Sequence, residues 1–374
     1  MKKRIVFFLI LILLTIFLTG CWDMMEINQR LFISSIGADL YDHEGMNKLL
    51  VTYVYPNIHA IGKNATEEKK KYVISTPSSS IFQAGKEFSG NVEYPCCYKH
   101  VKVFIFGEDV IKDENITREI IDELNRDTMI NKKVFILVAD DKAKDILESK
   151  APQVQITDGT IYNILRDNRS ASRFTPQTLT NMISDLDCNG VTLIPRIIKK
   201  GKELSISGAA IVKNYKLVGW IGEKENRAIS LVNGAVGREI MDIVYNDSIL
   251  SYTITKIDAN KKVDIDENIT ANIFIRLEGY IQGYKMDIET NLFKNEILLD
   301  MEKALAKEIE KEIRETLFFI QKKHNADVIG IGSHIRKFHP KTWKKVEDNW
   351  ENIFSEVKFN VTVDPIIRRT GLTK

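Results

Sequence analysis

Cysteine is scarce in this chain, and the cysteines that occur form none of the spacings that metal or redox chemistry uses. Four are present in 374 residues, and Cys96, Cys97 and Cys188 are the three that follow residue 21. None stands in a Cys-x-x-Cys pair, so zinc and thioredoxin-like signatures are missing. Adjacent Cys96 and Cys97 are either two small apolar residues at the start of a strand or a vicinal disulfide. The first interpretation is favoured because free cysteine behaves as a small hydrophobe.

The chain also lacks an excess of charge of one sign. Its 53 Lys and Arg residues stand against 51 Asp and Glu residues. Three of the basic residues, Lys2, Lys3 and Arg4, precede the apolar run that opens the chain, and without them the net charge is about −1. No clustered stripe of Lys and Arg follows. Nucleic acid is therefore not an expected partner, because phosphate binding depends on such clusters.

The motifs of common enzyme classes are absent or incomplete. No Gly-x-Ser-x-Gly elbow marks a nucleophile, and Gly330-Ile331-Gly332 lacks the third glycine of a dinucleotide loop. His324, His334 and His339 do not have the i, i+4 spacing of a helical zinc site. The acidic stretch 258–267 lacks the central glycine of a calcium loop and is expected to form a solvated hairpin turn. We therefore expect no enzymatic activity, no catalytic or metal site, and no cofactor.

The longest apolar run opens the chain, from Ile5 to Phe17, and it ends in Leu18-Thr19-Gly20-Cys21. It is shorter than the roughly 20 residues that cross a bilayer, and its basic start is that of a secretory signal peptide. A cysteine directly after Leu-Thr-Gly is where lipoprotein maturation attaches a diacylglyceryl group. The sequence predicts that residues 1–20 are removed and that a lipid on Cys21 anchors the protein to a membrane. An ordinary signal peptide with a coincidental cysteine is the alternative.

Residues 21–190 are expected to form an α/β domain. The stretch Leu31–Ala38 is rich in β-branched and apolar residues, which favours a strand. A strand over Val101–Phe106, a helix over Asn115–Asn125 and a strand over Val134–Val138 then follow one another. This order is typical of a crossover unit with parallel strands.

The rest of the chain divides into two further segments. Residues 191–236 hold short hydrophobic stretches separated by glycines, which predict a small sheet-rich middle domain. Residues 237–374 are expected to form an α+β domain whose periodic segment, about 291–323, makes a helix on the order of 45 to 50 Å long. This helix would cover an antiparallel sheet. The predicted fold class is α+β, multi-domain, with mixed sheets flanked by helices.

An aromatic stripe accompanies a second predicted helix that begins at Pro340. Trp343, Trp350 and Phe354 fall on one face of this helix. Aromatic residues concentrate at interface hot spots, so the stripe is a candidate partner surface. Helical spacing in a domain of this size favours core packing instead.

Four stretches of the sequence point to a known family. They are Gly20-Cys21-Trp22-Asp23 at the predicted lipidation site, His100–Asp127, Gly208–Trp220 and Ala326–Phe354. Together they make the chain resemble the Ger(x)C spore-germination lipoproteins, the C subunits of nutrient germinant receptors in endospore-forming bacteria. The pair Cys96-Cys97 is not a feature of that pattern.

The resemblance implies a three-domain mixed α/β protein tethered to the outer face of the inner spore membrane. It implies work with two integral-membrane partners, the A and B subunits, in nutrient sensing, and a family without known enzymatic activity or cofactor. The alternative function is a membrane-anchored solute-binding lipoprotein that captures a nutrient directly. Such a protein usually has two similar α/β lobes, whereas three unlike segments follow one another here.

Overall fold

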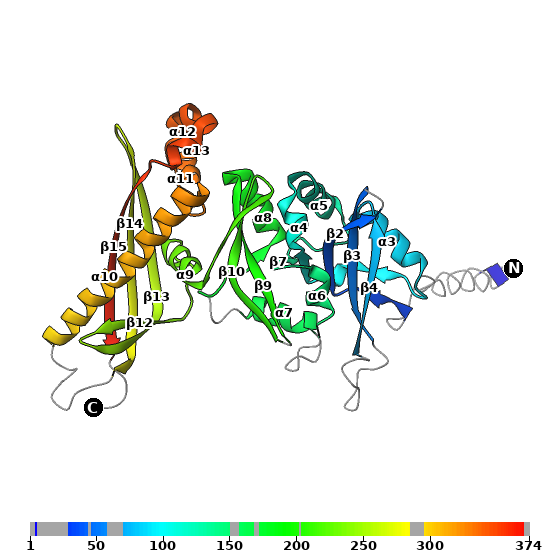
Figure 1. Cartoon of the computed structure of the whole chain (residues 1–374), viewed down its shortest axis with the longest axis horizontal. Helices are drawn as coiled ribbons and strands as arrows, with labels where there is room; N and C mark the ends of the chain where they lie inside the picture. The colour runs from blue at the N-terminus through cyan, green and yellow to red at the C-terminus, as the bar shows by residue number, and fades with distance from the viewer. Residues whose placement is uncertain are drawn as a thin grey trace.

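The computed structural model describes residues 4–5, 29–43, 46–57, 70–149, 157–167, 172–201, 203–284 and 295–369. These residues form an elongated molecule (Figure 1). The N-terminal part of the chain forms one end, and a four-stranded sheet crossed by a long helix forms the other. The predicted α+β class with mixed sheets is confirmed.

The larger sheet has nine strands in the order β11-β10-β9-β7-β6-β2-β3-β4, with β8 paired to β7. β2, β6, β7 and β9 pair in parallel, and the outer pairs on both sides are antiparallel. The strands are β2 (Ser35–His43), β3 (Met46–Pro56), β4 (Lys71–Ser78), β6 (Val103–Phe106), β7 (Phe135–Ala139), β8 (Gln177–Thr178), β9 (Val191–Lys200), β10 (Glu203–Lys213) and β11 (Lys216–Ile221).

Helices cover both faces of this sheet around its centre. β6 is fully buried, as a parallel strand covered on both sides should be. Phe104 and Phe106 point into one core with α3 (Ile81–Gly90), α4 (Glu108–Lys112), α5 (Glu114–Arg126) and α8 (Leu179–Asn189). Val103 and Ile105 point into a second core with α6 (Ala143–Leu147) and α7 (Thr157–Arg166). The predicted crossover unit is confirmed as β6, α5 and β7, because β6 and β7 pair in parallel.

The middle segment does not form a sheet of its own, contrary to what its turn-rich sequence suggested. β9 joins the N-terminal sheet through β7, where Val138 pairs with Arg196 and Ala139 with Ile197. Backbone hydrogen bonds therefore cross the boundary expected at residue 190. α9 (Glu223–Val232) packs instead with the core of the C-terminal sheet. The segment thus links the two ends of the molecule, and the domain limits 21–190, 191–236 and 237–374 stay predictions.

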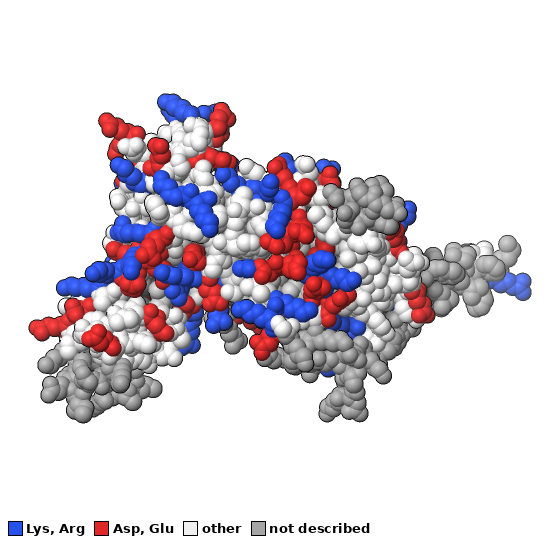
Figure 2. Space-filling view, viewed as in Figure 1, with Lys and Arg blue, Asp and Glu red and all other residues white. Residues whose placement is uncertain are grey.

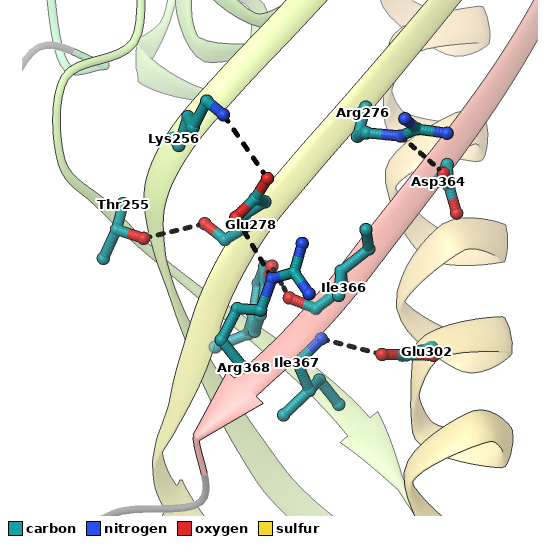
Figure 3. A network of polar contacts seen from close by, with 10 residues as sticks. Thr255, Lys256, Arg276, Glu278, Glu302, Asp364, Ile366, Ile367 and Arg368 are labelled. Carbon is teal, nitrogen blue, oxygen red and sulfur yellow. Dashed lines mark hydrogen bonds and ion pairs between the residues drawn. The ribbon is translucent and has the colours of Figure 1, made fainter.

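The C-terminal sheet has the order β12-β13-β14-β15. Its first three strands are antiparallel, and β15 joins β14 in parallel. Ion pairs tie the strands together on the polar outer face, such as Arg276–Asp364 at 2.9 Å and Arg368–Glu278 at 3.1 Å (Figure 3). The strands are β12 (Glu239–Tyr245), β13 (Ser248–Ile265), β14 (Ile269–Tyr284) and β15 (Lys358–Arg369).

The long helix α10 (Asn295–Phe319) crosses the inner face of this sheet (Figure 1). Its 25 residues are about 37 Å long, and a π-helical turn, η4 (Ile320–His324), continues it. The first residues of the predicted helix, 291–294, lie outside the described residues. The periodicity of this segment predicts one buried apolar stripe that begins at Leu298. Leu298 is half-buried, and the other members of the stripe are buried: Met301, Leu305, Ile309, Ile313, Leu317 and Ile320.

Short elements complete the two ends. The helix predicted from Pro340 is divided into α12 (Pro340–Val346) and α13 (Trp350–Phe354), with the short η5 (Glu347–Asn349) between them. Trp350 and Phe354 are buried, and Trp343 meets Trp350 edge-on at 5.5 Å between ring centroids. The aromatic stripe therefore packs in the core. The other short elements are β1 (Leu31–Phe32), β5 (Cys96–Cys97), η3 (Tyr98–His100) and α11 (Ile331–Phe338).

Candidate functional site

The described fold begins at the end of the molecule that lies farthest from the C-terminal sheet (Figure 1). There β1 pairs in parallel with β5, with Leu31 opposite Cys96 and Phe32 opposite Cys97. Cys21, the predicted lipidation site, lies outside the described residues. Leu31 is the tenth residue after Cys21, and an extended chain of ten residue steps spans at most roughly 35 Å.

A pocket of about 250 Å³ opens near this end, between α3 and the end of α5. Gly85, Tyr98, Glu123 and Asp127 form its half-buried wall. Phe82 and Met129 stand at its mouth with 52% and 43% of their surface exposed. The floor is apolar apart from one phenol and is buried; it consists of Ile36, Tyr53, Ile81, Leu124 and Ile130.

Hydrogen bonds hold the pocket wall in place. Glu123 accepts hydrogen bonds from the backbone N–H groups of Ile81 and Phe82, at 2.9 and 3.3 Å, and so caps the start of α3. Burial raises the pKa of Glu123, and these backbone donors oppose that shift. Tyr53 and Tyr98 donate to the carbonyl oxygens of Ile81 and Gly85, each at 3.3 Å.

The two phenols are neutral at ordinary pH. Burial raises the pKa of Tyr98 to about 12 and raises that of Tyr53 still further. Their hydroxyl groups therefore act as hydrogen-bond donors and acceptors. The described lining contains no histidine or cysteine, and its one serine, Ser89, donates to the carbonyl oxygen of Gly85. The pocket can bind a small group, but it contains no activated nucleophile.

An ion pair fixes the middle segment to the long helix. Arg227 on α9 donates from Nε and Nη2 to both carboxylate oxygens of Glu312 on α10, at 2.8 and 2.7 Å. Glu239 lies 3.7 Å from the same guanidinium. Burial disfavours the charge of Arg227, but the hydrogen bonds and charge of Glu312 outweigh it and raise the Arg227 pKa. Bidentate geometry of this kind fixes orientation as well as distance.

A second contact joins η4 to β11. Nδ1 of His324 lies 3.2 Å from the carbonyl oxygen of Val218. A Cβ atom on Gly219 would stand 2.1 Å from Cε1 of the imidazole. Glycine is therefore required at position 219 for this close approach. Burial lowers the pKa of His324.

The residues that the sequence singled out as candidates for metal or cofactor chemistry have structural roles in the fold. In the described part of the chain, no three His, Cys, Asp or Glu side chains are grouped so that they could hold a metal ion. Gly330 has a φ of +72° and precedes α11, and its neighbours Ile331 and Gly332 donate their backbone N–H groups to the buried carboxylate of Asp327 at 2.9 and 2.7 Å. Cys96, Cys97 and Cys188 are free thiols.

The expected hairpin turn over 258–267 needs correction. Residues 258–265 lie inside β13 and pair with β14, so only the end of that stretch turns. Separately, none of the helices among the described residues has both the length and the hydropathy that crossing a bilayer requires.

Comparison with known proteins gives two family matches that follow one another along the chain. Residues 23–199 match the family described as spore germination protein N-terminal domain. Residues 207–371 match the family described as spore germination B3/GerAC like, C-terminal. The two matches together cover nearly all of the chain that follows the predicted signal peptide.

Individual relatives align over almost their full length. Spore germination protein YndF of Bacillus subtilis (strain 168) is 26% identical over 100% of this chain and 98% of the relative. Spore germination protein B3 of the same strain is 23% identical over 97% of this chain and 96% of the relative. Spore germination protein GerQC of Bacillus cereus is 26% identical over all of both chains.

The crystal structure of the GerBC protein has the same fold. It superposes with a TM-score of 0.62 at 18% identity and covers 92% of this chain and 100% of its own. The family consists of germinant receptor subunits and is not known for enzymatic activity. The consecutive family matches, the full-length relatives and this common fold lead to one conclusion: the chain belongs to the Ger(x)C family of spore germination proteins.

Proposed function

We propose that this protein is the lipid-anchored C subunit of a spore nutrient germinant receptor and acts with membrane-embedded A and B subunits to trigger germination. The observation that carries the proposal is the match to both family models, from residue 23 to residue 371. The segment before residue 23 contains the predicted lipidation site, Cys21, at the position where mature lipoproteins begin.

The position of the first strand supports an anchor at Cys21. A tether of at most roughly 35 Å would hold the N-terminal domain next to the outer face of the inner spore membrane. The C-terminal sheet lies at the opposite end of the molecule (Figure 1). The protein would then be held at one end, with the rest of its surface open to partner subunits.

The surface charge suits contact with proteins. Lys and Arg side chains are interspersed with Asp and Glu side chains over the middle and C-terminal parts of the face drawn in Figure 2. No large area of one sign covers this face. Such a pattern favours directional polar contacts over general attraction to nucleic acid.

Co-purification from spores tests the partnership. The full-length protein, tagged at its C-terminus, is extracted from spore membranes in mild detergent and captured, and its companions are identified by mass spectrometry. We expect the A and B subunits to be recovered with it in fixed ratio, and to be absent from a parallel capture of an unrelated tagged spore lipoprotein. Membranes that contain the tagged protein but yield neither subunit would contradict the proposal.

A further inference from the structure

The pocket between α3 and the end of α5 carries an inference beyond the receptor role, and it does not depend on the lipid anchor. We propose that this pocket binds a small organic cation: an apolar body that fills the floor and an ammonium group that lies at the wall. The size of the pocket, the chemistry of its floor and the charges around it each support one part of this description.

The size and the floor define the apolar body. Ligand sites for drug-sized molecules occupy about 300 to 1,000 Å³, so a pocket of about 250 Å³ suits a single ring or a branched alkyl chain. Ile36, Leu124 and Ile130 are almost completely buried beneath it. Phe82 and Met129 are exposed at the mouth, and a ligand that reached them would remove their apolar surface from water.

The wall offers acceptors for an ammonium group. The hydroxyl of Tyr98 donates its proton to the carbonyl oxygen of Gly85 and lies beside the hydroxyl of Ser89. A phenolic oxygen has two lone pairs, so it can still accept a hydrogen bond from a ligand. The acidic residues Glu123 and Asp127 belong to the same wall. Hydrogen bonds from an ammonium group to a carboxylate are about twice as strong as those between neutral groups.

The surrounding charges make the pocket electronegative. Among the described residues that line it, Lys86 is the one basic residue, against Glu123 and Asp127. Lys132 is not part of the lining, but its ammonium group donates to the backbone oxygens of Leu124 and Asp127 and interacts with the charge of Asp127. The charges of Glu123 and Glu87 add to the effect of burial in raising the pKa of Tyr53, and Asp127 acts in the same direction on Tyr98. A field that disfavours a phenolate favours a cation.

The experiment uses three probes with one aromatic body and different charges. The purified full-length protein is titrated with 2-phenylethylamine, 3-phenylpropionate and 2-phenylethanol in a calorimeter. We expect the amine to bind with a dissociation constant of about 1 mM or less, and the acid and the alcohol to bind at least tenfold more weakly. Failure of the amine to bind at 10 mM, or equal binding of the amine and the acid, would overturn the proposal.

Two variants, each with a matched control, locate the site. Asp127→Asn keeps an oxygen that can accept the hydrogen bond from the backbone N–H group of Met129, but it removes the negative charge of the side chain. It should weaken amine binding about tenfold. Asp122→Asn removes the same charge from an exposed position on α5 and should leave binding unchanged.

Gly85→Leu fills the pocket, because a Cβ atom there already stands 3.1 Å from the hydroxyl of Tyr98. It should abolish binding. Gly90→Leu, where a Cβ atom meets nothing within 4 Å, should not. Circular dichroism checks that both leucine variants fold. Equal effects of Asp127→Asn and Asp122→Asn would overturn the assignment even if Gly85→Leu failed to fold.

Discussion

Glutamates of α10 protect the free edge of the C-terminal sheet, and removal of one of them should expose a single backbone N–H group of that edge. Among the described strands, β15 is the last of its sheet, and no other described strand pairs with its outward backbone N–H groups. Ile367 donates instead to Glu302 at 2.7 Å, and Val363 donates to Glu310 at 3.0 Å (Figure 3 shows the first of these). Such protection limits pairing of the edge with other chains.

Glu302→Ala leaves the N–H group of Ile367 without its charged acceptor. A hydrogen bond to a charged group contributes about 1.5 to 3 kcal/mol. If local opening exposes this amide, its hydrogen exchange should accelerate by roughly 10- to 150-fold. Exchange measured by mass spectrometry on a peptide that covers the end of β15 reports this directly.

Glu308→Ala is the matched control. Glu308 is an exposed glutamate of the same helix, so its replacement changes the helix propensity and the charge of α10 in the same way. We expect it to leave exchange at β15 unchanged. Equal exchange of Ile367 in the two variants would refute the role given to Glu302.

Three further predictions concern the contacts of the middle segment with α10 and with η4, which continues it. Gly219→Ala places a methyl group 2.1 Å from the ring of His324 and should cost about 1 to 3 kcal/mol; an unchanged urea midpoint would contradict this. Arg227→Met leaves Glu312 buried without its partner and should cost about 3 to 5 kcal/mol; a variant as stable as the parent protein would argue against it. Burial lowers the pKa of folded His324 below its ordinary 6.5, so the unfolded chain binds this proton more readily. The contribution of His324 to the free energy of unfolding should therefore be fully present above about pH 6.5 and should be lost as the pH falls below that value toward the lower pKa of the folded state. His324→Gln should reduce the loss of unfolding free energy between pH 7.5 and pH 5.5. Urea titrations at these two pH values that show the same loss in the variant and in the parent protein would be evidence against this role of His324.

The sequence predicted the elements whose periodicity is long and uninterrupted. The stripe from Met301 to Ile320 recurs every three or four residues, and the structure buries it as expected. The crossover unit followed from two apolar strands on either side of an amphipathic helix. In both cases the pattern that defines the element lies within one continuous stretch of sequence.

Long-range pairing could not be predicted in the same way. The middle segment joins the N-terminal sheet through the pairing of Val138 with Arg196, and no local pattern identifies that partner. The polar composition of the stretch 258–267 concealed an alternation in exposure. Ala259 and Val263 are shielded from solvent, and the residues that precede them, Asp258 and Lys262, are exposed. Period-two alternation was the signal for this strand.

The pocket could not be found from sequence spacing. Its lining comes from β2, β3, α3, η3 and the end of α5, so tertiary packing alone brings these residues together. Tyr53 belongs to a stretch rich in β-branched and aromatic residues, which predicts a strand but not a pocket. Its partners Tyr98 and Glu123 lie on other elements, at distances in sequence that no motif describes.

The most direct test of the central claim is nutrient-triggered germination of spores that carry Cys21→Ala, measured with membrane fractionation beside wild-type and deletion strains. We expect the variant protein to leave the membrane fraction. We also expect its spores to lose the nutrient response and still to germinate through a trigger that bypasses the receptor. Full membrane retention together with a normal nutrient response in the variant would contradict the lipid-anchored receptor subunit.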